Sequence, residues 1–94
     1  MRIIGIIPHP YLAISIFRND QRISIKLENE LYEQTYKLGD DERFTSIEAI
    51  HQFVDERFLE DVTRIFIQMH RARVGTMSRL AGPQNTEQDT EEII

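Results

Sequence analysis

The chain has 94 residues, of which 40% are hydrophobic and 29% charged, and its formal net charge is -5 at pH 7. This length leaves room for one hydrophobic core, and dimerisation is a common way for so small a domain to gain stability. The absence of cysteine excludes disulfides, thiolate metal sites and cysteine nucleophiles. It also favours a reducing compartment, so we expect a cytoplasmic protein.

The first apolar run, Ile3–Ile7, is interrupted only by Gly5 and predicts a strand over about 2–7. Pro8 and Pro10 follow it, and neither proline can donate a hydrogen bond to a sheet. The run is shorter than the apolar region of a signal peptide, and no run approaches the ~20 apolar residues that cross a membrane. We therefore expect no leader and no membrane partner.

The next three segments predict an antiparallel meander with strands over about 11–18, 22–28 and 31–38. A two-residue turn at Asn19-Asp20 would pair apolar residues across the first hairpin, namely Leu12 with Leu27, Ile14 with Ile25 and Ile16 with Ile23. A second turn at Asn29-Glu30 would pair Leu27 with Tyr32 and Ile23 with Tyr36. Opposed residues share a face, so this register predicts a sheet with one apolar side that needs a cover.

Two helices are predicted to supply that cover. Thr45 and Glu48 have the spacing of a capping box and predict a helix over about 46–54. Asp55 is expected to cap a second helix, because the phase of the apolar residues changes there. The second helix should end either at Gly75, as a C-terminal cap, or near Leu80.

Together these elements predict an α+β fold. An antiparallel β-meander of three to four strands is covered on one face by two C-terminal helices, over about 46–54 and 56–75 or 56–80. We expect residues 1–80 to form a single domain. Residues 81–94 are polar and acidic, and such a composition predicts a disordered tail.

The sequence has no recognisable catalytic constellation. It lacks a nucleophile elbow, a phosphate-binding glycine loop and a dinucleotide fingerprint, so we expect neither an enzyme nor a cofactor. Glu48, His51 and Asp55 would share a face of an unbroken helix and could then hold a metal ion. A solvated helix face with a local ion pair explains this spacing more simply, so no metal site is predicted.

The segment 70–80 is basic in an otherwise acidic chain, with three arginines and no acid. A helix that reaches residue 80 would be ~37 Å long, whereas a strand of seven residues spans ~23 Å. The last turns should then overhang the sheet and offer a docking surface formed by Arg71, Arg73, Met77 and Arg79. The simpler explanation is that cations near a helix C-terminus are favourable by ~0.3–1 kcal/mol each.

The isoleucine-rich first strand is a second candidate surface. If Ile3 and Ile7 face the helices, Ile4 and Ile6 face outward, and an exposed apolar edge strand invites pairing with another chain. The competing explanations are that this strand is central in the sheet or that the tail covers it.

We therefore expect a small cytoplasmic protein-interaction module that acts by contact, with homodimerisation as its leading form. Its partner would be another protein or a second copy of itself. One alternative is a nucleic-acid or polyanion-binding accessory protein that uses the basic helix end, although three arginines without aromatic neighbours make a thin patch. The other is a small-ligand carrier or enzyme with a pocket between the helices, Tyr32 and Tyr36.

Overall fold

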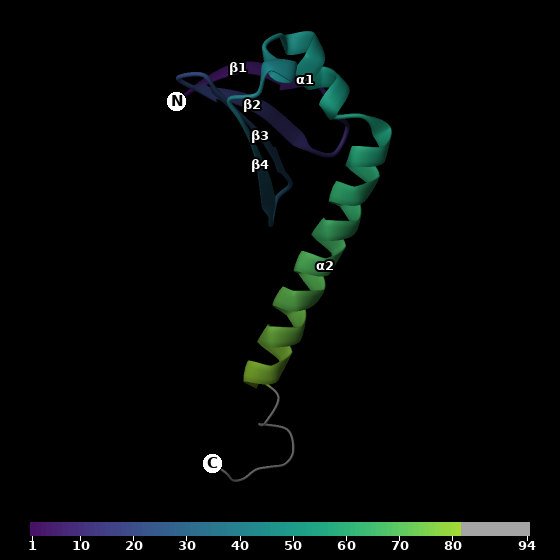
Figure 1. The fold of residues 1–94 in the computed structure, drawn as a ribbon. Coiled ribbons are helices and arrows are strands. Elements are labelled where there is room, and N and C mark those ends of the chain that lie inside the picture. Colours follow the sequence, from purple (N-terminus) through teal and green to yellow (C-terminus); the bar gives the residue numbers. More distant parts are fainter. Residues whose placement is uncertain (82–94) are drawn as a thin grey trace. The chain divides into compact units, whose positions relative to one another are not determined.

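The structure is a computed structural model that describes residues 1–81. Its four strands are β1 (Arg2–Ile7), β2 (Ala13–Asn19), β3 (Arg22–Glu28) and β4 (Glu33–Gly39). They form one antiparallel sheet in the order β1-β2-β3-β4 (Figure 1). A 3-10 helix η1 and two α-helices follow, over Glu42–Phe44, Ile47–Phe53 (α1) and Glu56–Ala81 (α2). The predicted α+β meander with two C-terminal helices is confirmed.

Helix α2 crosses the boundary between two compact units, Met1–Thr63 and Arg64–Ile94, and each is described by itself. The first unit holds the sheet, η1, α1 and the first turns of α2. The second, as far as Ala81, is the remainder of α2. The single domain over residues 1–80 stays a prediction, as does the overhang of α2. The predicted tail began at Ala81, which is instead the last residue of α2, and its remaining residues, 82–94, lie outside the described part of the chain.

The β2–β3 turn lies one residue further along the chain than the sequence suggested. Asp20 and Gln21 form it, and Asn19 pairs with Arg22 instead of turning. Asp20 has a φ of 61°, the left-handed conformation that the first central residue of a two-residue hairpin adopts. The apolar pairs are therefore Ile14–Leu27 and Ile16–Ile25, and the predicted partners across this hairpin are wrong.

The β3–β4 connection is a four-residue loop and not the predicted two-residue turn. The Asn29 side-chain oxygen accepts hydrogen bonds from the backbone N–H groups of Leu31 and Tyr32, both at 2.9 Å. This Asx-type turn lengthens the loop, and the strands resume with Glu28 opposite Glu33. The predicted partners across this hairpin are also wrong, since the inner pairs are Leu27–Gln34 and Ile25–Tyr36.

The core nevertheless forms on the predicted side of the sheet, because both register errors are of two residues and leave every side chain on its face. We call this covered side the inner face and the opposite side the outer face. The buried inner-face residues of β2 and β3 are Ile14, Ile16, Ile23, Ile25 and Leu27. Ile50 and Val54 follow from the α1 region, and Val62 from the start of α2, all three buried.

The helix ends follow from local capping. Ser46, and not Thr45, caps α1: its hydroxyl oxygen accepts a hydrogen bond from the N–H of Ala49 at 3.1 Å. Asp55 caps α2 as predicted, accepting from the N–H of Phe58 at 2.8 Å. Helix α2 continues through Gly75, which lacks the positive φ of a C-terminal glycine cap, so the later of the two predicted ends is correct.

A buried polar link ties β4 to α2 within the first unit. Gln34 is 8% exposed, and its side-chain N–H donates to the backbone carbonyl of Val62 at 2.9 Å. The hydroxyl of Tyr36 donates to the amide oxygen of Gln34. The Tyr36 ring packs edge-on against Phe58, with ring centroids 5.0 Å apart. Burial, with the negative charge of Asp61 adding to it, raises the pKa of Tyr36.

Candidate functional site

Strand β1 is an edge strand, since within the described residues it pairs with β2 alone. A β-bulge between Ile3 and Gly5 sets the direction of its side chains: Ile3 pairs with Phe17, but Gly5 pairs with Ile16. Gly5 faces inward, because a Cβ there would meet the Cδ1 of Ile16 at 3.4 Å and that of Ile47 at 3.6 Å. The extra residue is Ile4.

The bulge places Ile3 and Ile6 together on the outer face, 55% and 66% exposed. Ile6 lies where the sequence suggested. Ile3 takes the outward place expected for Ile4, which is half-buried and lines a cavity on the inner face. The signal for this was Gly5, because an isolated glycine in a strand pattern often marks a bulge.

Ile3 has a large apolar neighbour on the outer face of β2, whereas Ile6 lies opposite Ser15. Phe17 lies directly opposite Ile3 and is half-buried, with the Lys26 ammonium 5.4 Å from its ring centroid. We call Ile3, Ile6 and Phe17 the β1 edge patch. Between Ile3 and Ile7 the strand carries no charged residue.

The other sheet edge differs in chemistry. Strand β4 exposes Glu33, Thr35 and Lys37. Charged side chains on an edge strand oppose pairing with another chain. The sheet therefore has one charged edge and one apolar edge.

The residues predicted to form a surface near the end of α2 are all exposed, but they do not lie together. Successive helical residues are ~100° apart, so Arg71 and Arg73 point to nearly opposite sides. Met77 lies on the side of Arg73, one turn further on. Arg79 lies nearer to the side of Arg71, and its guanidinium donates to the hydroxyl of Thr76 at 2.9 Å. The basic end of α2 therefore has no single basic face.

The structure does not bring the histidine and acidic residues considered in the sequence together into one site. Helix α1 ends at Phe53, so Glu48 and His51 do not share an unbroken helix with Asp55. Within residues 1–81, no three histidine or acidic side chains are placed to hold a metal ion together. The acidic turn after β4 leads into η1, where Asp41 accepts a hydrogen bond from the N–H of Arg43 at 2.9 Å.

Asp41 is also the ion-pair partner of Arg43. The guanidinium donates to both carboxylate oxygens, at 3.1 and 2.8 Å. These hydrogen bonds from the side chain and backbone of Arg43 lower the pKa of Asp41 to about 2. The Asp41 carboxylate is therefore already paired with Arg43.

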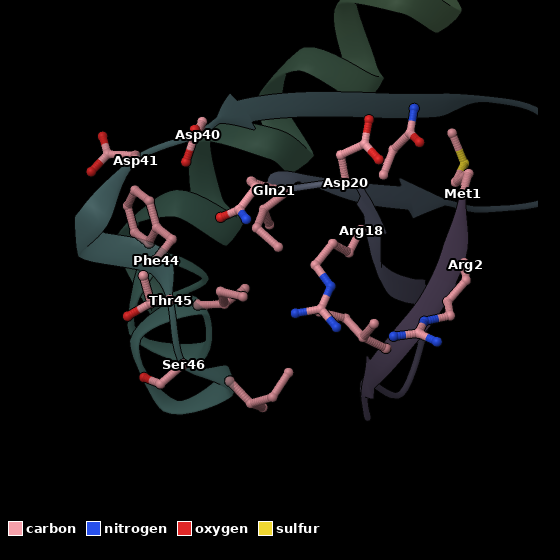
Figure 2. Close-up of a pocket in the computed structure, with 15 residues that line it drawn as sticks. Met1, Arg2, Arg18, Asp20, Gln21, Asp40, Asp41, Phe44, Thr45 and Ser46 are labelled. Atoms are coloured by element: carbon pink, nitrogen blue, oxygen red, sulfur yellow. The ribbon is translucent and has the colours of Figure 1, made fainter.

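A cavity of about 780 Å³ opens on the inner face, beside the β2–β3 turn and the η1–α1 segment (Figure 2). Its apolar lining comes from Ile4, Ile23, Phe44, Ile47 and Ile50. Its charged lining comes from Arg2, Arg18, Asp20, Asp40 and Asp41. The sequence placed a pocket beside Tyr32 and Tyr36 instead. Tyr32 is the last residue of the β3–β4 loop, at the other end of the strands, and neither tyrosine lines this cavity.

Sequence reasoning missed both arginines of the cavity. Arg18 could have been found, because it continues the alternation of Ile14 and Ile16 and so belongs to the inner face. Arg2 could not, because the face on which its side chain lies depends on the bulge.

Comparison with protein-family models, with curated proteins and with solved structures finds no match for this chain. In residues 1–81 no helix combines the length and apolarity that crossing a membrane requires.

Proposed function

We propose that this protein is an interaction module that acts by contact, and that it forms a homodimer by pairing β1 with β1 of a second copy. The observation that carries this proposal is the exposure of Ile3 and Ile6 on an edge strand, at 55% and 66%. An unpaired edge strand presents a row of free N–H and C=O groups to solvent. Exposed apolar side chains beside that row add burial to the hydrogen bonds that a new strand would form.

The difference between the two edges supports β1 as the pairing strand. The exposed positions of β4 include Glu33 and Lys37, which protect that edge. In β1 the one charged residue is Arg2, at the start of the strand. The rest of β1 therefore lacks the charged side chains that usually prevent an edge strand from pairing with another chain.

A second copy fits this edge well in the antiparallel direction. Two identical strands then pair about a twofold axis, and the same patch serves both partners. Arg2 of each copy would lie near the far end of the other strand, about 17 Å from its counterpart at 3.4 Å per residue. Parallel pairing would bring the two arginines together. Charge therefore favours the antiparallel dimer.

Light scattering of the full chain tests the proposal. At about 100 µM we expect a mass near twice the 11.1 kDa of the chain, since association depends on concentration. Ile6→Lys places a charge in the β1 edge patch and should return the mass to that of one chain. Thr35→Lys adds the same side chain at an exposed position of β4 and should leave the dimer intact.

Either of two results would overturn this proposal. One is a wild-type chain that remains monomeric at the same concentration. The other is a dimer that Ile6→Lys does not weaken, and a dimer dissolved by Met77→Lys instead would place the interface on α2. Ile6 is exposed, so the lysine variant should fold, which its circular dichroism spectrum will show.

The alternative of nucleic-acid binding gains no support from the arrangement of α2. Its arginines point to different sides, whereas a polyanion groove needs cations along one track. A cytoplasmic location stays a prediction.

A further inference from the structure

We infer that the cavity beside Arg2 and Arg18 binds a small organic anion, with a compact carboxylate or phosphate head group on an apolar body. This goes beyond the proposed dimer, because pairing of β1 edges does not use the inner face. The inference rests on the placement of two arginines, on their lack of partners and on the lining of the cavity.

Arg2 and Arg18 lie directly opposite each other in the β1–β2 ladder. Opposed residues of an antiparallel pair point to the same side, and like charges placed so are destabilising. Arg18 also pairs with Ile23, which is 6% exposed on the inner face. Both guanidinium groups therefore belong to the inner side of the sheet, where both line the cavity.

Within residues 1–81, neither Arg2 nor Arg18 forms an ion pair or a side-chain hydrogen bond. Arg43 shows the contrast, because it engages Asp41 through two nitrogens. A guanidinium group carries donors in a fork that matches the oxygens of a carboxylate or phosphate. An oxyanion between Arg2 and Arg18 would relieve their repulsion and satisfy those donors.

Figure 2 shows how these groups lie in the cavity. Arg18 extends from β2 across the opening toward Thr45 and Ser46, and the guanidinium of Arg2 turns to the same side. Asp41 points away from the opening, consistent with its pairing to Arg43.

The size and floor of the cavity indicate a ligand with an apolar body. Its volume of about 780 Å³ falls within the ~300–1,000 Å³ of small-molecule sites. Isoleucine side chains from β1, β3 and α1 line it, including the fully buried Ile50. Bare phosphate would leave this apolar surface wet.

The acidic rim indicates a small molecule and not a polyanion. Asp20 and Asp40 also line the cavity. They would repel a chain of phosphates that extends past the opening, whereas one head group between Arg2 and Arg18 stays closer to the cations. The charge pattern therefore selects a single compact anion.

Titration of the full chain with octanoate, phenyl phosphate and inorganic phosphate, followed by amide NMR, tests this inference. We expect saturable shifts at Arg18, Thr45 and Ile47 with octanoate or phenyl phosphate. The tighter of these two identifies the head group as carboxylate or phosphate. Inorganic phosphate should bind at least about tenfold more weakly, because it buries no apolar surface.

Matched variants separate this site from general electrostatic attraction. Arg18→Gln should weaken binding by about tenfold or more, and Arg2→Gln should do the same. Arg22→Gln removes the same charge from a residue that does not line the cavity and should leave the affinity unchanged. Ile6→Lys should also bind normally, even if it abolishes the dimer.

Two results would overturn the inference. One is the absence of saturation by octanoate and by phenyl phosphate up to about 10 mM, a concentration at which even weak specific sites fill. The other is equal weakening by Arg18→Gln and Arg22→Gln, which would assign the effect to net charge. Amide spectra of each variant without ligand establish that it is folded.

Discussion

Gln34 provides a sharp test of how the first unit is packed. Its amide is buried with both ends engaged, one by the Val62 carbonyl and one by the Tyr36 hydroxyl. Gln34→Leu keeps a similar volume and removes both hydrogen bonds. The Val62 carbonyl retains the donor of its own helix, so the main loss is the acceptor for Tyr36. We expect a cost of about 1–3 kcal/mol in the free energy of unfolding.

Gln34→Glu has the same shape but a different consequence. It replaces the donor that lies 2.9 Å from the Val62 carbonyl with an acceptor. At neutral pH it also buries a charge without a cation, for which we expect a cost of about 3–5 kcal/mol. Burial raises the pKa of the introduced carboxyl above its ordinary ~4.3. The neutral acid can donate to the Val62 carbonyl, so the cost should shrink as the pH falls from the raised pKa toward that ordinary value, and it should be lost below it.

Urea unfolding followed by circular dichroism, near pH 7.5 and near pH 4, measures these costs. The quantity to compare is the difference between Gln34→Glu and Gln34→Leu at each pH, because it cancels the acid sensitivity of the rest of the chain. We expect the glutamate variant to be the less stable at the higher pH and the gap to close at the lower. A gap that does not change with pH would refute the burial of Gln34 against α2.

Gly39→Ala should lower stability by about 1 kcal/mol in thermal unfolding, because Gly39 has a φ of 74° and nothing lies near its missing Cβ. Gly75→Ala should instead stabilise its helix by about 0.5–1 kcal/mol, measured as slower amide exchange, and faster exchange would contradict a helical Gly75. Asp41 should titrate near its pKa of about 2 in carboxyl NMR, and its contribution to stability, present above 3.8, should be lost as the pH falls through that pKa. Arg43→Gln should return this pKa toward 3.8, and no change would refute the pairing.

The sequence predicted the faces of the sheet better than its register. Alternation with a period of two placed Ile14, Ile16 and Ile25 on one side, and burial on that side holds for any shift of two residues. The turns were harder to predict, because Asn19 and Asp20 both suit a hairpin. The conformation of position 20 decides the matter, and it leaves Gln21 as the second turn residue.

The candidate sites show a similar limit. Gly5 signalled a bulge, but its effect on Ile3 and Ile4 depends on where the extra residue falls in the ladder. The pairing of Arg2 with Arg18 follows from that bulge and could not be predicted from spacing alone. The end of α2 was left open because a glycine inside a helix costs only about 1 kcal/mol, which the rest of a long helix tolerates.

The polar loop residues determine the register of the strands, although they are exposed. A shift of β2 against β3 by two residues would bury nearly the same apolar surface. The hydrophobic effect alone therefore hardly distinguishes the native hairpin from one shifted in register. That decision falls to Asp20 and, across the next hairpin, to Asn29. A hairpin formed in the shifted register would have to break its strand pairing before the turn could re-form in the native position.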